Sequence, residues 1–313
     1  MNNDPQNSKR PIDVAKEGLY SALDIDSLGL CEDDFYYRDT NHRSIGFKTG
    51  VVGKTIDFFC NIFNLNCYRD RFDKKFRESI SGDGNELTKN DALHSSSLCA
   101  LLCFFNVSPT HPFTYDDITY NNAFFEVKNK VFKTPSNMDV VLTGEDKHGN
   151  DSILFIECKF SEFIGAGAYT LSSKYTDGEY GSIFEDFRYS DCKVFQYGLK
   201  QLVAHYIGIT NFVNRFTGYD LSNYYEDERA SLYKKDFKNV SFIEVLFEFK
   251  NKPDYITYKN EATQVFEALK SYENRRQSKI KLYGTTTYQE LFQGENNRVL
   301  PQKVGLFYRL AEK

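Results

Sequence analysis

Apolar residues recur along the chain at two spacings, one typical of helices and the other typical of strands. The helical spacing is clearest where Phe195, Leu199 and Leu202 follow one another with polar residues between them. Gly208 comes soon after this run, in the position of a C-cap. Long helices are predicted in this way over residues 86–105, 184–207 and 261–279.

Runs rich in β-branched and aromatic residues predict the strands. They cover residues 124–132, 140–142, 152–160, 241–249 and 303–310. The second and third of these runs flank a turn of glycine, acidic and amide residues, so we expect a hairpin centred on His148. Thr287 and Glu290 have the spacing of a capping box, which begins a short helix. Strands interleaved with helices predict an α/β fold with a central mixed β-sheet flanked by helices.

The first part of the chain differs from the rest in its pattern. Residues 1–10 are polar and rich in asparagine, and we expect them to be disordered. Residues 11–80 mix short apolar stretches with charged segments and are interpreted as an N-terminal extension. A loop with glycine-rich turn chemistry then opens the predicted main domain, which covers residues 81–313.

The composition argues against a membrane protein and against a secreted, disulfide-rich protein. A chain of 313 residues can bury a core without disulfides, and its hydrophobic and charged contents, 41% and 27%, are ordinary for a soluble protein. Its longest apolar run, residues 98–105, is far too short for a membrane span, and no signal peptide is visible. The seven cysteines are odd in number and never spaced as C-x-x-C. We therefore expect a cytoplasmic protein that does not associate with membranes.

One group of charged residues has a spacing that predicts chemistry. Asp139 lies before one strand of the predicted hairpin, and Glu157 and Lys159 lie at the end of the other. Pairing about His148 sets Asp139 opposite Glu157, and alternation along the strand places Lys159 on the same face as Glu157. Two carboxylates side by side need a compensating cation, which Lys159 supplies in part and a divalent ion bound by oxygen ligands would complete. The alternative is that Glu157 and Lys159 form a simple ion pair and that Asp139 is a turn residue.

The order of helix, strand, hairpin and helix around these residues resembles the PD-(D/E)xK nuclease superfamily, which has the restriction-endonuclease-like fold. Its Asp, Glu and Lys correspond to Asp139, Glu157 and Lys159, although its Pro-Asp dipeptide is absent and Pro135 stands four residues before Asp139. The resemblance covers roughly residues 80–250. Further matches to a bacterial subgroup of restriction endonucleases are residues 82–87 and 94–97, together with Gln196, Lys200, Gln201 and His205.

The resemblance implies a Mg²⁺-dependent endonuclease that hydrolyses DNA, of restriction type, in which Mn²⁺ can replace Mg²⁺. Asp139, Glu157 and the backbone carbonyl of Cys158 would hold the metal. Glu86 on the preceding helix would be an outer or second ligand, and Glu126 on the first strand competes with it for that role. The resemblance gives Lys159 the task of orienting or activating the attacking water and of stabilising charge.

Charge limits how such a protein can hold DNA. The net charge of −5 gives no general attraction to a polyanion, so a local patch must provide it. The predicted DNA contacts are three residues that share one helical face, Lys193, Gln196 and Lys200. The alternative is that this face is simply exposed to solvent. The basic segments 69–77 and 274–281 are the next candidates.

Other functions stay open at this point. A nuclease fold that has lost catalysis would serve as a binding or assembly module, and an ordinary interaction protein would use Glu157 and Lys159 only as an ion pair. A homodimer is compatible with the sequence, and the sequence does not identify a methyltransferase partner, a recognition site or the strandedness of the nucleic acid.

Overall fold

The structure is a computed structural model that describes residues 9–42, 44–49, 52–81, 89–164, 198–276 and 279–310. The chain forms two compact units. The first comprises residues 1–113 and 291–313, and the second comprises residues 114–290. The predicted boundary at residue 80 therefore falls inside the first unit, whose last part is contributed by the C-terminal residues.

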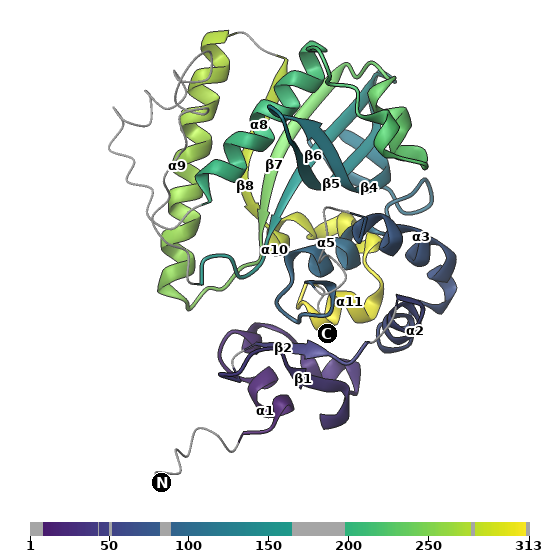
Figure 1. The fold of residues 1–313 in the computed structure, drawn as a ribbon, viewed down its shortest axis with the longest axis vertical. Helices are drawn as coiled ribbons and strands as arrows, with labels where there is room; N and C mark the ends of the chain where they lie inside the picture. The colour runs from purple at the N-terminus through teal and green to yellow at the C-terminus, as the bar shows by residue number, and fades with distance from the viewer. Residues whose placement is uncertain are drawn as a thin grey trace. The chain divides into compact units, whose positions relative to one another are not determined.

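The first unit is mainly helical (Figure 1). Its elements are α1 (Pro11–Lys16), β1 (Phe35–Tyr37), β2 (Ile45–Phe47), α2 (Val52–Ile62), α3 (Arg69–Ser79), α5 (Ser96–Phe104) and α11 (Gln302–Phe307), with the 3₁₀ helices η2 (Tyr20–Ala22), η3 (Ile25–Leu28), η4 (Glu32–Asp34), η5 (Asn66–Tyr68) and η8 (Gly294–Val299). Aromatic rings fill its core: Phe59 of α2 meets Phe47 at 5.7 Å and Phe76 at 6.2 Å between ring centroids. Burial of such large rings is the main source of stability here.

The second unit is built on a six-stranded sheet in the order β3-β4-β5-β6-β7-β8. The strands are β3 (Phe113–Tyr115), β4 (Ile118–Lys130), β5 (Pro135–Asp146), β6 (Asp151–Lys159), β7 (Asn239–Leu246) and β8 (Ile280–Thr287). β4, β5 and β6 pair antiparallel, whereas β6, β7 and β8 pair parallel, so the sheet is mixed. This confirms the α/β class with a mixed sheet and flanking helices.

Two long helices lie on one face of this sheet, α8 (Leu199–Asn214) and α9 (Pro253–Arg276) (Figure 1). Phe212 of α8 packs on Phe155 of β6, and Phe266 of α9 packs on Phe242 of β7. Phe155 and Phe242 are partners in register and so share a face of the sheet. The unit also contains η6 (Ser222–Tyr224), η7 (Glu228–Tyr233) and α10 (Tyr288–Leu291).

Most of the outer edge of β4 is covered by side chains rather than by a strand. β3 has only three residues, so it leaves the second half of β4 unpaired on that side. Arg229 donates to the carbonyl of Phe125 at 2.9 Å, and the Tyr225 hydroxyl donates to the carbonyl of Glu126 at 3.1 Å. Tyr225 also accepts the N–H of Lys128 at 2.6 Å. The backbone groups of an otherwise open edge are thereby satisfied.

The structure corrects several sequence predictions. Residues 303–310 are not a strand: α11 occupies Gln302–Phe307, where Val304, Phe307 and Tyr308 are buried at helical spacing. Among the described residues of the helix predicted over 86–105, the long helix is α5, which begins at the side-chain cap of Ser95; the non-helical residues 91–95 separate it from residues 89–90. Within the described residues, the helix predicted over 184–207 is α8, which ends at Asn214.

Gly208 lies inside α8 and is not its C-cap, which is Arg215. A Cβ atom at Gly208 would lie 2.8 Å from the Cβ of Asn129 in β4. Glycine therefore serves here to let the helix approach the sheet closely.

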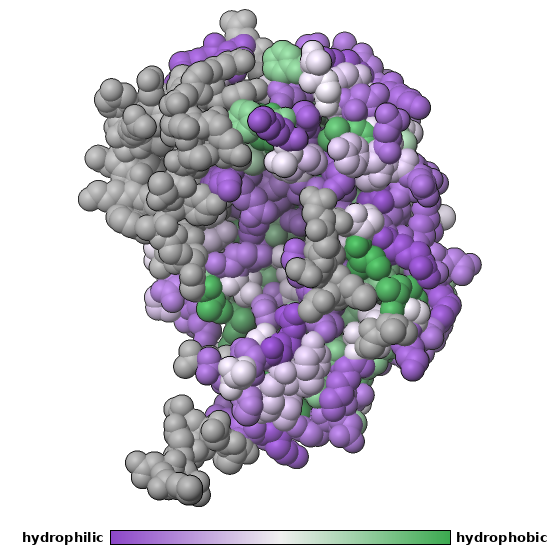
Figure 2. Space-filling view, viewed as in Figure 1, coloured by the Kyte–Doolittle hydropathy of each residue, from purple (hydrophilic) through white to green (hydrophobic). Residues whose placement is uncertain are grey.

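The capping box is confirmed: Glu290 N–H donates to Thr287 Oγ1 at 3.1 Å, and Glu290 accepts the Thr287 N–H at 2.9 Å. Among the described residues no helix is both long and apolar enough to cross a membrane. Hydrophilic residues predominate on the face drawn in Figure 2, and apolar residues form only small patches there.

Candidate functional site

The hairpin of β5 and β6 has the register that the sequence predicts. Val140 pairs with Ile156 and Glu145 with Asp151, so Asp139 and Glu157 are next in register beyond the last paired residues. Beyond this point the backbones of β5 and β6 are no longer paired. The Asp139 side chain instead accepts the Cys158 N–H, through Oδ2, at 2.7 Å. The Cys158 carbonyl points to the same side of β6 as its N–H, towards β5.

Glu157 and Lys159 form a buried ion pair. The exposed fractions of the two residues are 1% and 7%, and Lys159 Nζ lies 2.5 Å from Glu157 Oε1. Lys159 also donates to Gln201 Oε1 of α8 at 2.8 Å. Burying charged groups is unfavourable because they lose their hydration. Here the short contacts of the Lys159 ammonium group offset this penalty for that group and for Glu157 Oε1.

The second oxygen of Glu157 is less well satisfied. It lies 2.9 Å from Nε2 of His205, one helical turn after Gln201 on α8, and His205 is 1% exposed. The alignment is poor, and neither Glu157 Oε2 nor either ring nitrogen of His205 makes a hydrogen bond. Buried polar atoms without hydrogen bonds are uncommon in proteins, and each needs an explanation such as strain, a catalytic role, or a water molecule or ion that completes it.

Acidic residues form a row across four neighbouring strands at the level of Glu157. Glu244 of β7 is its partner in register and is fully buried. Glu126 of β4 lies opposite Asp139, between the pairs Phe125–Val140 and Val127–Met138. We call Glu126, Asp139, Glu157 and Glu244 the acidic row. Neighbouring strands are about 4.8 Å apart, so carboxyl groups at adjacent positions of this row repel one another when both are ionised.

Glu126 has a strained backbone. Its φ of 51° lies in the left-handed region, within a strand and on a residue other than glycine. Such a conformation costs on the order of 1–3 kcal/mol and persists when the surroundings enforce it. Here the Tyr225 hydroxyl holds the Glu126 carbonyl. Glu126 is only 9% exposed, so the strained residue places its side chain in the interior.

The electrostatics of the row differ from residue to residue. Burial raises the pKa of Asp139 well above its ordinary value, and the nearby charges of Glu157 and Glu126 raise it further. Burial also opposes the ionisation of Glu157, but His205 and Lys159 outweigh it and lower the pKa of Glu157 to about 2. Against its own burial, Lys159 keeps a pKa well above the ordinary value because of Glu157. At neutral pH the site therefore contains a carboxylate, an ammonium group and a second carboxyl that ionises reluctantly.

A divalent metal ion at this site would need oxygen ligands from the residues around Glu157. Among the described residues, no group of three or more His, Cys, Asp or Glu side chains is gathered closely enough to hold one by itself. Mg²⁺, however, commonly uses one or two carboxylates and keeps several waters. The buried Glu157 Oε2, which accepts no hydrogen bond, together with Asp139 and the Cys158 carbonyl, provides oxygen donors of that kind. The residues fit a weakly held ion.

The structure brings together only part of the predicted site. Asp139, Glu157, Lys159 and the backbone of Cys158 converge, and Gln201 and His205 join them. Glu86, Lys193 and Gln196 lie outside the described residues. Lys200 is half-buried in the first turn of α8.

The basic segment 69–77, a candidate for phosphate contacts, is largely engaged with the protein itself. Arg77 pairs with Asp73 at 2.8 Å, and Lys75 pairs with Glu78 at 2.8 Å in the interior. Arg71 donates to Asn106 at 2.6 Å. These three side chains thus have partners within the protein, and the phosphate contacts of this segment stay a prediction.

Sequence analysis overlooked Glu244. The signal that could have revealed it is a single acidic residue inside the apolar run Ile243-Glu244-Val245, because a charge in a central strand needs a partner or a function. Searches with this chain find no matching family model, curated protein or solved structure, so the interpretation of the site rests on its own geometry.

Proposed function

We propose that this chain is a metal-dependent nuclease that hydrolyses phosphodiester bonds in DNA, with Mg²⁺ as the natural ion and Mn²⁺ as a substitute. The restriction-endonuclease-like fold, and a role as a restriction enzyme, belong to the same proposal. The observation that carries it is the acidic row beside a buried lysine, at the point where β5 and β6 part.

The charge balance of the site favours this function over a simple ion pair. An ion pair of Glu157 and Lys159 needs neither Asp139 beside it nor Glu244 in register with it. Asp139 adds repulsion, because the charge of Glu157 raises its pKa further above the ordinary value, and an ion pair of Glu157 and Lys159 alone does not require this cost. A site that binds a cation and a phosphate provides the compensation.

In this proposal Asp139, Glu157 and the Cys158 carbonyl hold the metal. When bound, the ion would lower the pKa of a water molecule and neutralise charge on the scissile phosphate. Lys159 is held by Glu157 and Gln201, and because its pKa is raised it keeps its proton. It is therefore suited to orient water and to stabilise the developing negative charge, and poorly suited to act as a base. Of the two candidates for an outer ligand, Glu126 lies opposite Asp139 in register, whereas Glu86 lies outside the described residues.

The test compares Asp139→Asn with the wild type on supercoiled plasmid, in Mg²⁺, in Mn²⁺ and in EDTA. Asparagine can still accept the Cys158 N–H, so the variant keeps the local structure and loses the charge. We expect cleavage by the wild type only with metal, and a fall of about a hundredfold or more in the variant. The matched control is Glu145→Gln, which changes an exposed carboxylate at the other end of β5.

Calorimetry with Mn²⁺ separates the alternatives. Metal binding without cleavage would favour a nuclease fold that has lost catalysis. Absence of both metal binding and cleavage in the wild type would leave the ion pair as the explanation of the site. Equal cleavage by the wild type and Asp139→Asn would contradict the assignment of Asp139.

A further inference from the structure

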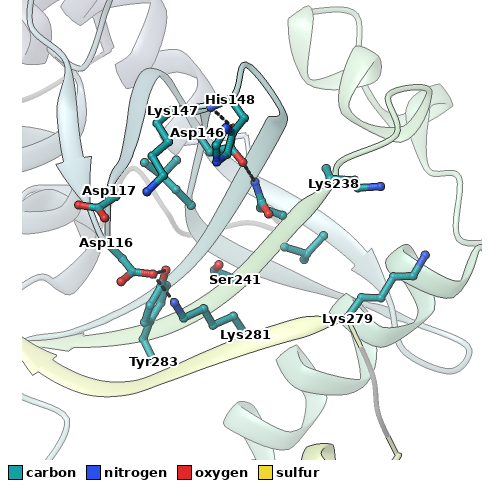
Figure 3. A pocket seen from close by; sticks show the side chains of 13 residues that line it. Asp116, Asp117, Asp146, Lys147, His148, Lys238, Ser241, Lys279, Lys281 and Tyr283 are labelled. Atoms are coloured by element: carbon teal, nitrogen blue, oxygen red, sulfur yellow. Dashed lines mark hydrogen bonds and ion pairs between the residues drawn. The ribbon is translucent and has the colours of Figure 1, made fainter.

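A cavity of about 410 Å³ lies in the second unit where β7 and β8 begin (Figure 3). The turn between β3 and β4 and the turn between β5 and β6 complete its wall. Ser241 of β7 lines it, three residues before Glu244, so the two differ by about 10 Å along the strand and point to opposite faces. The cavity is therefore separate from the acidic row.

Two of the three carboxylates that line this cavity are already satisfied by the protein, and the third, Asp117, is exposed. Asp146 accepts the N–H groups of His148 and Asn150 at 2.8 and 2.9 Å, and the side-chain amides of Asn150 and Asn239 at 2.9 and 3.0 Å. The hydrogen bonds from Asn150 make the largest contribution to lowering the pKa of Asp146. Asp116 accepts from Lys281, and also from the Tyr283 hydroxyl at 2.6 Å.

Three of the four lysines that line the cavity are not paired in this way; the fourth is Lys281. Lys147 comes from the β5–β6 turn, Lys238 precedes β7 and Lys279 precedes β8. None of these ammonium groups forms an ion pair with another described residue. Figure 3 shows Lys147 on the side of the Asp116 turn and Lys238 and Lys279 on the other. Lys147, Lys238 and Lys279 thus bring three exposed lysines from separate elements to the rim of the cavity, and in Figure 3 the ends of Lys238 and Lys279 point away from the Asp116 turn.

We propose that this cavity binds a phosphate group. Lysine ammonium groups bind phosphate as point charges, and several of them from different elements can surround a tetrahedral anion. The volume is in the range of pockets for small ligands and exceeds what one phosphate needs, so a phosphate ester fits. Ser241 and Asn239 add polar groups to the wall. This inference does not depend on the nuclease proposal.

The test is a calorimetric titration of the full chain with inorganic pyrophosphate. EDTA is present so that no metal ion at the acidic row contributes to binding. We expect binding by the wild type and by Asp139→Asn alike. In the double variant Lys238→Gln/Lys279→Gln the dissociation constant should rise by about tenfold for each lysine removed. Lys234→Gln, an exposed lysine outside the cavity, is the matched control and should bind as the wild type does.

Two sources of phosphate are separated by a second titration, with mononucleotides and with a DNA duplex in Ca²⁺. If the double variant loses affinity only for pyrophosphate and mononucleotides, the ligand is a free phosphate ester. A parallel loss of duplex affinity, with a shallower salt dependence, identifies the nucleic-acid backbone. Absence of pyrophosphate binding by the wild type, or equal affinity in the double variant and the control, would overturn the proposal.

Discussion

The two ends of the sheet in the second unit use charge in opposite ways. At the end of β6, Glu157 and Lys159 are buried, and two further carboxyl groups, Asp139 and Glu244, stand beside them. Where β8 begins, Lys281 and Asp116 also form an ion pair, but their side chains are 58% and 44% exposed. Water screens the exposed pair and not the buried one. Similar contacts thus have very different consequences: the exposed pair contributes little to stability, whereas the buried pair is costly to break.

The largest effect is expected from breaking the buried pair. Lys159→Met leaves Glu157 charged in the interior, so the free energy of unfolding should fall by about 3–5 kcal/mol. Lys281→Met at the exposed pair should lower it by at most about 1 kcal/mol. Urea unfolding measures both. Adding Glu157→Gln to Lys159→Met should restore part of the loss, and equal losses at the two ends would refute the contrast.

Asp139→Asn should stabilise the protein at neutral pH, because it removes a carboxylate that is costly to ionise. The raised pKa of Asp139 contributes stability that is present below the ordinary value of 3.8 and lost as pH rises through the folded value. We therefore expect a melting temperature higher by about a few degrees at pH 7 and no difference at pH values below 3.8.

The pH dependence that Glu157 contributes to stability is opposite to that of Asp139. Its lowered pKa gives a stabilisation that is present above pH 4.5 and is lost as pH falls towards about 2. Both the wild type and Asp139→Asn should therefore lose stability in strong acid. A variant that is less stable than the wild type at pH 7 would mean that Asp139 is chiefly a structural acceptor for Cys158.

Glu244→Gln gives a smaller effect that sharpens the description of the acidic row. If Glu244 contributes to the negative potential that attracts the cation, the dissociation constant for Mn²⁺ should rise by about tenfold, which corresponds to about 1.4 kcal/mol. Calorimetry measures it against the Glu145→Gln control. Thr285 Oγ1 of β8 donates to Glu244 Oε2 at 3.4 Å. Unchanged metal affinity combined with lower stability would show that Glu244 is only a structural acceptor for Thr285.

The smallest effect concerns the turn between β3 and β4. Asp116 and Asp117 have φ values of 50° and 61°, which favour glycine in a two-residue hairpin turn. Asp117→Gly should therefore raise the free energy of unfolding by about 0.5–1 kcal/mol. A loss of stability would show that the Asp117 carboxylate itself supports this end of the sheet.

Sequence analysis succeeded where the information is local. The turn centred on His148 fixes the register of β5 and β6, and alternation along β6 then places Glu157 beside Asp139 and on the same face as Lys159. The pairing of Glu157 with Glu244 is different in kind. It joins parallel strands separated by the whole stretch between β6 and β7, and its register depends on packing that no local pattern encodes.

The same limit explains the errors. Strand β8 was not predicted, because it directly follows a charged segment of the sequence. The alternation of buried residues that is typical of a strand begins only at Ile280 and Leu282. α11 contains apolar residues that suit either a strand or a short helix, and tertiary packing decides between them. The assignment of residues 291–313 to the first unit follows from contacts between the two ends of the chain, such as the Asp24 N–H with the Phe307 carbonyl.

The covering of β4 by Arg229, Tyr225 and Tyr233 has a consequence for the behaviour of the protein in a crowded solution. These side chains belong to a segment about a hundred residues away in the chain, and they occupy backbone groups that could otherwise pair with a strand of another molecule. Local opening of residues 225–233 would therefore create an adhesive edge while the core stayed intact. Resistance to aggregation thus depends on how firmly this short segment stays closed, a property distinct from the global stability of the fold.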